Sequence, residues 1–117
     1  MKIGELSAKT GLSIYTIRYY EKIGILKESK KDRSGRREYS ADDVEWIKFI
    51  ECLQATDMTL EEILQFISLR ERGDQTIGER LALLSRRKGK LLEKIAVLHA
   101  HLEHIDYKIR HFEKILK

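Results

Sequence analysis

The stretch Ser13-Ile-Tyr-Thr-Ile-Arg-Tyr-Tyr20 predicts a short helix with two different faces, opened by Ser13 as its N-cap. Apolar residues at three-residue steps form the face expected to point inward: Ile14, Ile17 and Tyr20. The outward face carries Tyr15, Thr16, Arg18 and Tyr19. A guanidinium can bind a guanine edge or a phosphate, and hydroxyls suit phosphate oxygens. The outward face is therefore a candidate nucleic-acid surface, although an ordinary amphipathic helix with two solvated aromatic rings would show the same pattern.

A first helix and a glycine turn precede this stretch. Residues 3–10 are expected to be helical with Leu6 inward, and Gly11 suits the left-handed position that ends a helix. The second helix is expected to run to Ile23 and to stop at Gly24. Two helices joined by a short turn that contains glycine are typical of the helix-turn-helix arrangement, whose second helix enters the major groove of DNA.

The segment from Ile25 to Tyr39 predicts a β-hairpin with a glycine-containing tip. Between Lys27 and Arg37 it carries six basic and two acidic residues. A basic hairpin beside a recognition helix is a wing, which lies along the phosphate backbone of DNA. The alternative is a solvated charged loop, which is commoner in general. The position of the segment directly after a helix-turn-helix favours the wing.

Two more helices are expected before residue 73. Ser40 followed by two aspartates is a strong helix start, and Thr59 with Glu62 forms a capping box that opens the next helix. The stripe expected to point inward from the third helix is Val44, Ile47, Ile50 or Glu51, and Leu53 or Gln54, continuing through Ala55 and widened by Trp46 and Phe49. Those expected of the fourth helix are Leu60, Ile63, Leu64 and Ile67.

The last third of the chain predicts one long helix that begins at a capping box, Thr76 to Glu79. Steps of four and three residues select twelve positions, of which eleven are apolar, and a heptad held that long indicates a coiled coil. At 1.5 Å per residue the helix would be about 60 Å long, so its expected partner is a second copy of the chain. The predicted dimerisation residues are Ile77, Leu81, Leu84, Leu91, Ile95, Leu98, Leu102, Ile105, Ile109 and Phe112, with Leu116 continuing the pattern and Lys88 interrupting it.

Charge is distributed unevenly along the 117 residues. Residues 1–40 carry ten Lys/Arg against five Asp/Glu, residues 41–75 three against nine, and residues 76–117 ten against five, which gives +5, −6 and +5. A basic front segment favours one end of the molecule meeting a polyanion. The absence of proline favours long helices, and a single Cys excludes an intrachain disulfide framework. No signal peptide or membrane-spanning run is visible, so we expect a cytoplasmic protein.

Several motifs, in the right order over residues 1–70, resemble the MerR-type transcriptional regulators. These motifs are Ile3-Gly-Glu-Leu-Ser7, Thr16-Ile-Arg-Tyr-Tyr-Glu-Lys-Ile-Gly-Ile-Leu26, Arg37-Glu-Tyr39 with Asp43-Val44, Phe49-Ile50 with Leu53, and Met58-Thr-Leu-Glu-Glu-Ile63. The resemblance implies a mainly α fold: a winged helix-turn-helix DNA-binding domain at 1–72 and a dimerisation helix at 73–117 that pairs antiparallel with its twin. It also implies binding to promoter DNA that the protein distorts, and RNA polymerase as a further partner.

Carried over residue by residue, the resemblance places the DNA contacts on both predicted elements. On the helix they are Tyr15, Thr16, Arg18 and Tyr19, with Ser13 at its start, and on the wing they are Arg37 and Tyr39. Arg36 stands where the family often has Tyr, which adds a candidate phosphate contact.

Cys52 is the candidate sensing residue. Metal-sensing and redox-sensing branches of the family carry cysteines near the start or beyond the end of the dimerisation helix, and this chain has none there. We therefore expect no metal site and no cofactor. The sequence around Cys52 resembles a small branch that responds to aldehydes and other electrophiles through one cysteine. The alternative is a regulator with an unrelated effector, in which Cys52 is a buried, purely structural residue that packs as a small hydrophobic side chain.

Two other classes of protein fit the sequence less well. An enzyme is not expected, because no phosphate-binding loop, nucleophile–base pair or paired-carboxylate site stands out. A coiled-coil adaptor would explain the last third of the chain, but it has no need for Arg18 beside a basic hairpin. Histidines 99, 101 and 104 fall beside the heptad seam without a cluster of further ligands, so solvated side chains explain them better than a metal site.

Overall fold

The computed structural model describes residues 1–27 and 29–117, so Glu28 in the predicted hairpin segment lies outside the described residues. The chain divides into two compact units, Met1–Arg80 and Leu81–Lys117. In order, the elements are α1 (Ile3–Thr10), α2 (Ile14–Ile23), β1 (Lys30–Lys31), β2 (Arg37–Glu38), α3 (Ala41–Ala55), α4 (Leu60–Glu71), the 3-10 turn η1 (Asp74–Thr76) and α5 (Ile77–Leu116). The mainly α fold with a helix-turn-helix, a hairpin and a long last helix is thus confirmed. No described helix is long and apolar enough to cross a membrane.

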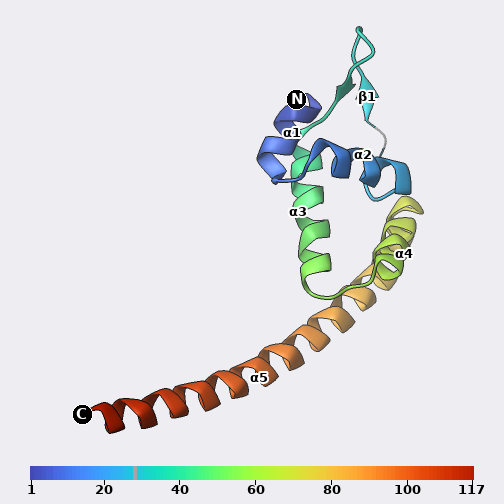
Figure 1. Cartoon of the computed structure of the whole chain (residues 1–117). Coiled ribbons are helices and arrows are strands. Elements are labelled where there is room, and N and C mark those ends of the chain that lie inside the picture. The colour runs from blue at the N-terminus through green and yellow to red at the C-terminus, as the bar shows by residue number, and fades with distance from the viewer. Residues whose placement is uncertain (28) are drawn as a thin grey trace. The chain divides into compact units, whose positions relative to one another are not determined.

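The helix-turn-helix forms at the local signals that predicted it. Gly11 and Gly24 end α1 and α2 in the left-handed conformation, at φ of 76° and 89°, where a Cβ would be strained. Ser13 caps α2 by accepting a hydrogen bond from the backbone N–H of Thr16 at 3.1 Å. Leu6 of α1 and Ile17 of α2 are fully buried, and both helices lie beside α3 in Figure 1.

A common core joins α1, α2, α3 and α4. Its fully buried side chains include Leu6, Ile17, Ile25, Leu26, Ile47, Ile50 and Ile63. Trp46 fixes the turn after α2, because its indole Nε1 donates to the Ile25 carbonyl at 2.8 Å. On the other side, Arg70 of α4 lies 4.1 Å from the Trp46 ring centroid, a cation–π contact that ties α4 to α3.

Two large apolar side chains expected to point inward are exposed. Ile14 is 39% exposed and Leu60 is 44% exposed. Each directly follows the N-cap of its helix, where the first turn extends past the packed face, so helical spacing alone placed them wrongly. Tyr20, Val44, Ile47, Ile50 and Leu53 are buried as predicted, whereas Trp46, Phe49 and Leu64 are only half-buried.

The predicted capping box at Thr76 is also corrected. Thr76 is fully buried, and its hydroxyl donates to the carbonyl oxygens of Leu69 at 2.6 Å and Gly73 at 2.8 Å. The same hydroxyl accepts from Arg80 Nε at 3.1 Å. Thr76 therefore connects the end of α4 to the first turn of α5, and Gly73 between them has a φ of 99°, which favours glycine.

Candidate nucleic-acid interface

The outward face of α2 presents the side chains that the sequence predicted. Tyr15 is 79% exposed and Tyr19 is 43% exposed, and Arg18 is exposed between them. These three residues and Lys22 line a shallow hollow of about 270 Å³. Ser13 and Thr16 lie at the start of the same helix, where their hydroxyl oxygens are 2.9 Å apart. Ser13 thus caps the helix that presents Arg18, and Thr16 bonds to this cap.

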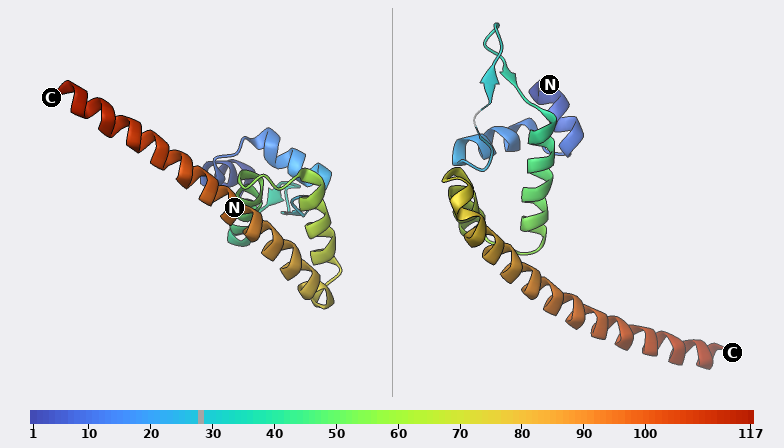
Figure 2. Two further views of the ribbon diagram at one scale, coloured as in Figure 1. Left: turned by 90° about the horizontal axis from the view of Figure 1, so that it is seen from below. Right: turned by 180° about the vertical axis from the view of Figure 1, so that it is seen from behind.

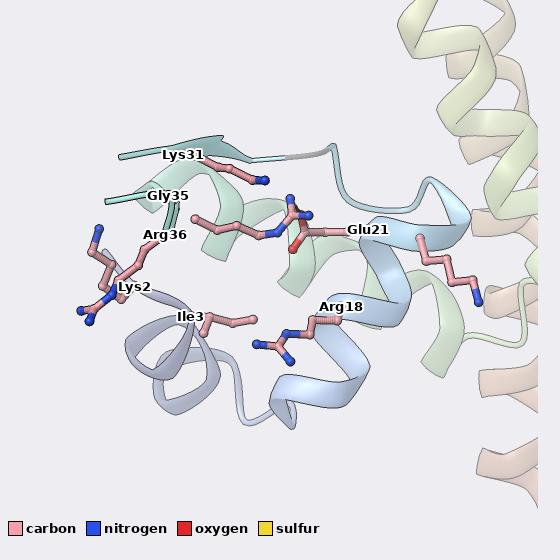
Figure 3. Close-up of a pocket in the computed structure, with 9 residues that line it drawn as sticks. Lys2, Ile3, Arg18, Glu21, Lys31, Gly35 and Arg36 are labelled. Carbon is pink, nitrogen blue, oxygen red and sulfur yellow. Dashed lines mark hydrogen bonds and ion pairs between the residues drawn. The ribbon is translucent and has the colours of Figure 1, made fainter. Parts of the chain in front are cut away.

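A larger concavity of about 780 Å³ lies between α2, the start of α1 and the hairpin. Figure 3 shows Arg18 and Lys31 on opposite sides of it, with Glu21 between them. The cationic side chains that line it are Lys2, Arg18, Lys22, Lys31, Arg36 and Arg37, and among the described residues Glu21 is the only acidic one to do so. A concave surface with this charge focuses attraction onto a polyanion.

Four of these cations are available for an external anion. Arg18, Lys22, Lys31 and Arg36 make no ion pair with any residue among 1–27 and 29–117. Each can therefore exchange its hydration for a phosphate oxygen without breaking a protein contact.

The hairpin is short but has the geometry of a wing. Lys30 and Lys31 pair with Glu38 and Arg37 in antiparallel register, and the hairpin extends past the helices in Figure 1 and in the right panel of Figure 2. Asp32 closes the tip by accepting from the backbone N–H groups of Ser34 at 2.8 Å and Arg36 at 2.9 Å, with Gly35 at φ 79°.

Lys2 ties the start of the chain to this wing. Its ammonium group donates to the carboxylates of both Asp32 and Glu38. These bonds raise the pKa of Lys2 and lower the pKa values of Asp32 and Glu38. The backbone N–H of Tyr39 donates to the Met1 carbonyl at 2.7 Å, which adds a second connection. Lys2 and the N-terminal ammonium, which lies 2.8 Å from Glu38 Oε1, thus offset the negative charges of Asp32 and Glu38.

Glu21 ties the other side of the wing to α2. Its side chain is 7% exposed, and it accepts from Arg37 Nη1 at 3.0 Å and from the Tyr39 hydroxyl at 2.5 Å. Tyr39 itself is only 4% exposed. The expected contact of Tyr39 with DNA is therefore corrected to a supporting role, since the ring is buried and its hydroxyl is already bonded.

We expect the Tyr39 hydroxyl to lose its proton at a higher pH than an ordinary tyrosine does. Burial, together with the hydrogen bond to Glu21, raises the pKa of Tyr39 from 10 to about 12. A pKa raised by folding stabilises the folded state below pH 10, and this contribution, no more than about 3 kcal/mol, is lost as pH rises from 10 to 12. Absorbance at 295 nm should show a tyrosinate component near pH 12 that disappears in Tyr39→Phe. A Tyr39→Phe titration identical to that of the wild type would contradict this assignment.

Sequence reasoning missed four residues of this interface. Lys22 and Lys31 are two of the ten Lys/Arg in residues 1–40, and charge alone does not indicate which of these side chains face the DNA. Lys2 pairs with residues that are distant in sequence. Glu21 had a signal: it falls one position after Tyr20 on the inward side of α2, and a buried carboxylate requires partners.

Cys52 is exposed on α3. The interpretation of Cys52 as a buried core residue is therefore wrong for this structure. Lys48 lies one helical turn before Cys52, and its Nζ is 3.7 Å from Glu45 Oε1, so this cation is paired with a carboxylate.

The apolar heptad of α5 is also uncovered in the single chain. Six of the predicted dimerisation residues are between 50% and 59% exposed: Ile95, Leu98, Leu102, Ile105, Ile109 and Phe112. Ile77 and Leu81 are 53% and 63% exposed, whereas Leu84 and Leu91 are half-buried. An apolar surface of this extent marks an interaction site.

The fold and this interface together define a winged helix-turn-helix DNA-binding protein. A family model described as "MerR HTH family regulatory protein" matches residues 1–69, and a second one, "MerR, DNA binding", matches residues 44–108. An uncharacterized HTH-type transcriptional regulator of Haemophilus influenzae is 35% identical over 106 residues, which cover 91% of this chain and 78% of the relative. This chain therefore belongs to the MerR family, and it is a DNA-binding transcriptional regulator rather than an enzyme.

Solved structures agree over nearly the whole chain. A MerR family transcriptional regulator from Listeria monocytogenes has a TM-score of 0.88 at 32% identity, covering 97% of this chain and 86% of that one. HiNmlR, described as a MerR family regulator lacking the sensor domain and bound to promoter DNA, has a TM-score of 0.85 at 33% identity, covering 97% and 90%.

Proposed function

We propose that this protein binds promoter DNA through α2 and the wing, and that it regulates transcription from that promoter. One observation carries the proposal: the cations of α2 and of the wing line a single concavity, and four of them have no anionic partner among the described residues. The proposed contacts are Tyr15, Arg18, Tyr19, Lys22, Lys31, Arg36 and Arg37, with Ser13 and Thr16 at the start of α2. The relative HiNmlR is bound to promoter DNA, which supports promoter DNA as the ligand of this protein.

The active form proposed is a homodimer held by α5. The uncovered heptad supports it, because burying such a row requires a second apolar surface of the same length. Family membership supports an antiparallel pairing. We propose residues 1–72 as the DNA-binding part and 73–117 as the dimerisation part, because α4 ends at Glu71 and Gly73 leaves the helical conformation.

Such a dimer would bind a pseudo-palindromic operator within a promoter, in the bacterial cytoplasm. The family pattern implies that effector binding makes the dimer distort the DNA, so that RNA polymerase can use the promoter elements. Polymerase is accordingly a proposed partner, reached through the shared promoter.

The test of DNA binding is the salt dependence of operator affinity. A promoter fragment from upstream of the protein's own coding sequence is titrated at several salt concentrations. If about six phosphates are contacted, the logarithm of the affinity should fall with a slope near −5 against the logarithm of the salt concentration. The control is a fragment of equal length with the operator scrambled, which should bind more weakly. Equal, salt-insensitive binding to both fragments would contradict the proposal.

We further propose that Cys52 senses electrophiles such as small aldehydes. The support is the exposure of Cys52 on α3, which leaves the thiol open to a soluble reagent, and the resemblance of its surroundings to the aldehyde-responsive branch. A MerR regulator with an unrelated effector is the second candidate. The pairing of Lys48 with Glu45 favours it, because a cation that is already paired stabilises a nearby thiolate less.

Cys52→Ser separates these two candidates. With a small aldehyde present, transcription in vitro from the regulated promoter should rise for the wild type and stay at the basal level for Cys52→Ser, because serine forms no comparable adduct. Mass spectrometry of the treated wild-type protein should show one adduct. Equal induction of the two proteins would assign the signal to another effector.

A further inference from the structure

Glu21 occupies an unusual place in the interface. It is a nearly buried carboxylate in a concavity that the described residues otherwise line with cations, and its hydrogen-bond donors among residues 1–27 and 29–117 belong to the hairpin segment. The donors are the backbone N–H of Ser29 at 3.4 Å, Arg37 Nη1 at 3.0 Å and the Tyr39 hydroxyl at 2.5 Å. Glu21 therefore contacts the segment before β1, the strand β2 and the residue after it.

The position of Glu21 on α2 matters as much as its partners. Arg18 lies three residues earlier, and residues at this spacing are neighbours on a helix surface. The wing is thus attached to α2 within one turn of the arginine that faces the DNA. Any rotation of the wing about this attachment would change the spacing between Arg18 and the cations Lys31 and Arg36.

We infer that Glu21 is a positioning residue for DNA binding: it holds the wing in register with α2, so that both elements meet the DNA as one preformed surface. The inference rests on the proposed function, because it concerns the same interface. Without Glu21 the wing would have to be ordered during binding, and that ordering reduces affinity.

The wing keeps other connections when Glu21 is changed. Lys2 still pairs with Asp32 and Glu38, and the Tyr39 N–H still donates to Met1. The core residues Ile17 and Tyr20 are untouched. We therefore expect Glu21→Gln to fold, with a wing that moves relative to α2.

The experiment compares Glu21→Gln with Glu45→Gln, a matched change at a 75% exposed glutamate on α3. Operator affinity should fall about tenfold or more in Glu21→Gln, because the amide keeps one acceptor oxygen but loses the negative charge and the second acceptor that bond Arg37, Ser29 and Tyr39. The salt slope should become shallower by about 2, one phosphate for each wing of the dimer. Ethylation interference should vanish at the phosphates contacted by the wing and persist in the groove read by α2. Glu45→Gln should match the wild type in all three measurements.

A role in stability alone would lower the unfolding temperature and leave the slope and interference pattern of the folded protein unchanged. That outcome overturns the inference. If Glu21→Gln does not fold, Tyr39→Phe removes one donor and is measured instead, and a wild-type slope with wild-type interference would overturn the inference there.

A measurement without DNA separates this inference from the proposed function. Amide hydrogen exchange at Ser29, whose N–H donates to Glu21 Oε2 at 3.4 Å, should accelerate in Glu21→Gln and not in Glu45→Gln. Absence of operator binding by the wild type would refute the proposed function, while faster exchange would still support the positioning role. Unchanged exchange in Glu21→Gln would refute that role, whatever the wild type binds.

Discussion

Replacing Leu98 with glutamate is expected to make the protein monomeric and to weaken its binding to a two-half-site operator about 100-fold or more. Leu98 is 57% exposed and lies near the middle of the 40-residue helix α5. In an antiparallel pair aligned over the whole helix, residues near the middle meet their own counterparts. The substitution therefore places two carboxylates together on a seam that is otherwise apolar.

The loss of DNA affinity follows from the loss of the dimer. A dimer binds its second half-site as an intramolecular event, whose effective concentration strengthens binding by a factor of 10²–10⁴. A monomer lacks this factor, although its α2 and wing are unchanged. Sedimentation equilibrium measures the mass, and operator titration measures the affinity.

Ala100→Glu is the matched control for this prediction. It adds the same charge two residues away, at the heptad position farthest from the seam. This variant should remain dimeric and bind the operator like the wild type. A dimeric Leu98→Glu, or equal dissociation of both variants, would contradict the assignment of the seam.

Replacing Arg18 with alanine is expected to have the next largest effect. A guanidinium that reads a guanine edge contributes about 1–3 kcal/mol for each half-site. A dimer uses Arg18 twice, so affinity should fall at least about thirtyfold. Discrimination at one base pair in each half-site should relax, because the edge that Arg18 recognises is no longer read. Affinities for a panel of single-base operator variants measure both effects.

Lys48→Ala provides the comparison, since it removes a cation on α3 that is paired with Glu45 and lies outside the concavity. It should leave the panel unchanged. A uniform loss across the panel for Arg18→Ala, with a shallower salt slope, would assign Arg18 to a phosphate instead of a base. Unchanged binding by Arg18→Ala would contradict its place in the interface.

The sequence alone determined the features that depend on neighbouring residues. Ser13 and Thr59 cap their helices as predicted, and Gly11 and Gly24 end theirs, because capping requires only a suitable side chain or a left-handed residue at one position. The class of fold followed from these signals and from the order of the elements.

The apolar row of α5 could also be read from the sequence, because heptad spacing is a property of one helix. These side chains are exposed in the structure, where the next longest described helix, α3, has 15 residues against the 40 of α5. The first-turn residues Ile14 and Leu60 show the limit of such spacing: periodicity gives a face, but not how far the neighbouring elements extend along it.

Only the tertiary structure decided how the wing is attached. Glu21 bonds Arg37 and Tyr39 across 16 and 18 residues of sequence, and Lys2 bonds Asp32 and Glu38 across 30 and 36. Tyr39 changed from an expected DNA contact to a buried support, and Cys52 proved to be exposed. The physical reason is that such contacts depend on how α1, α2 and the hairpin dock, and docking geometry is set jointly by the whole core and not by any local pattern.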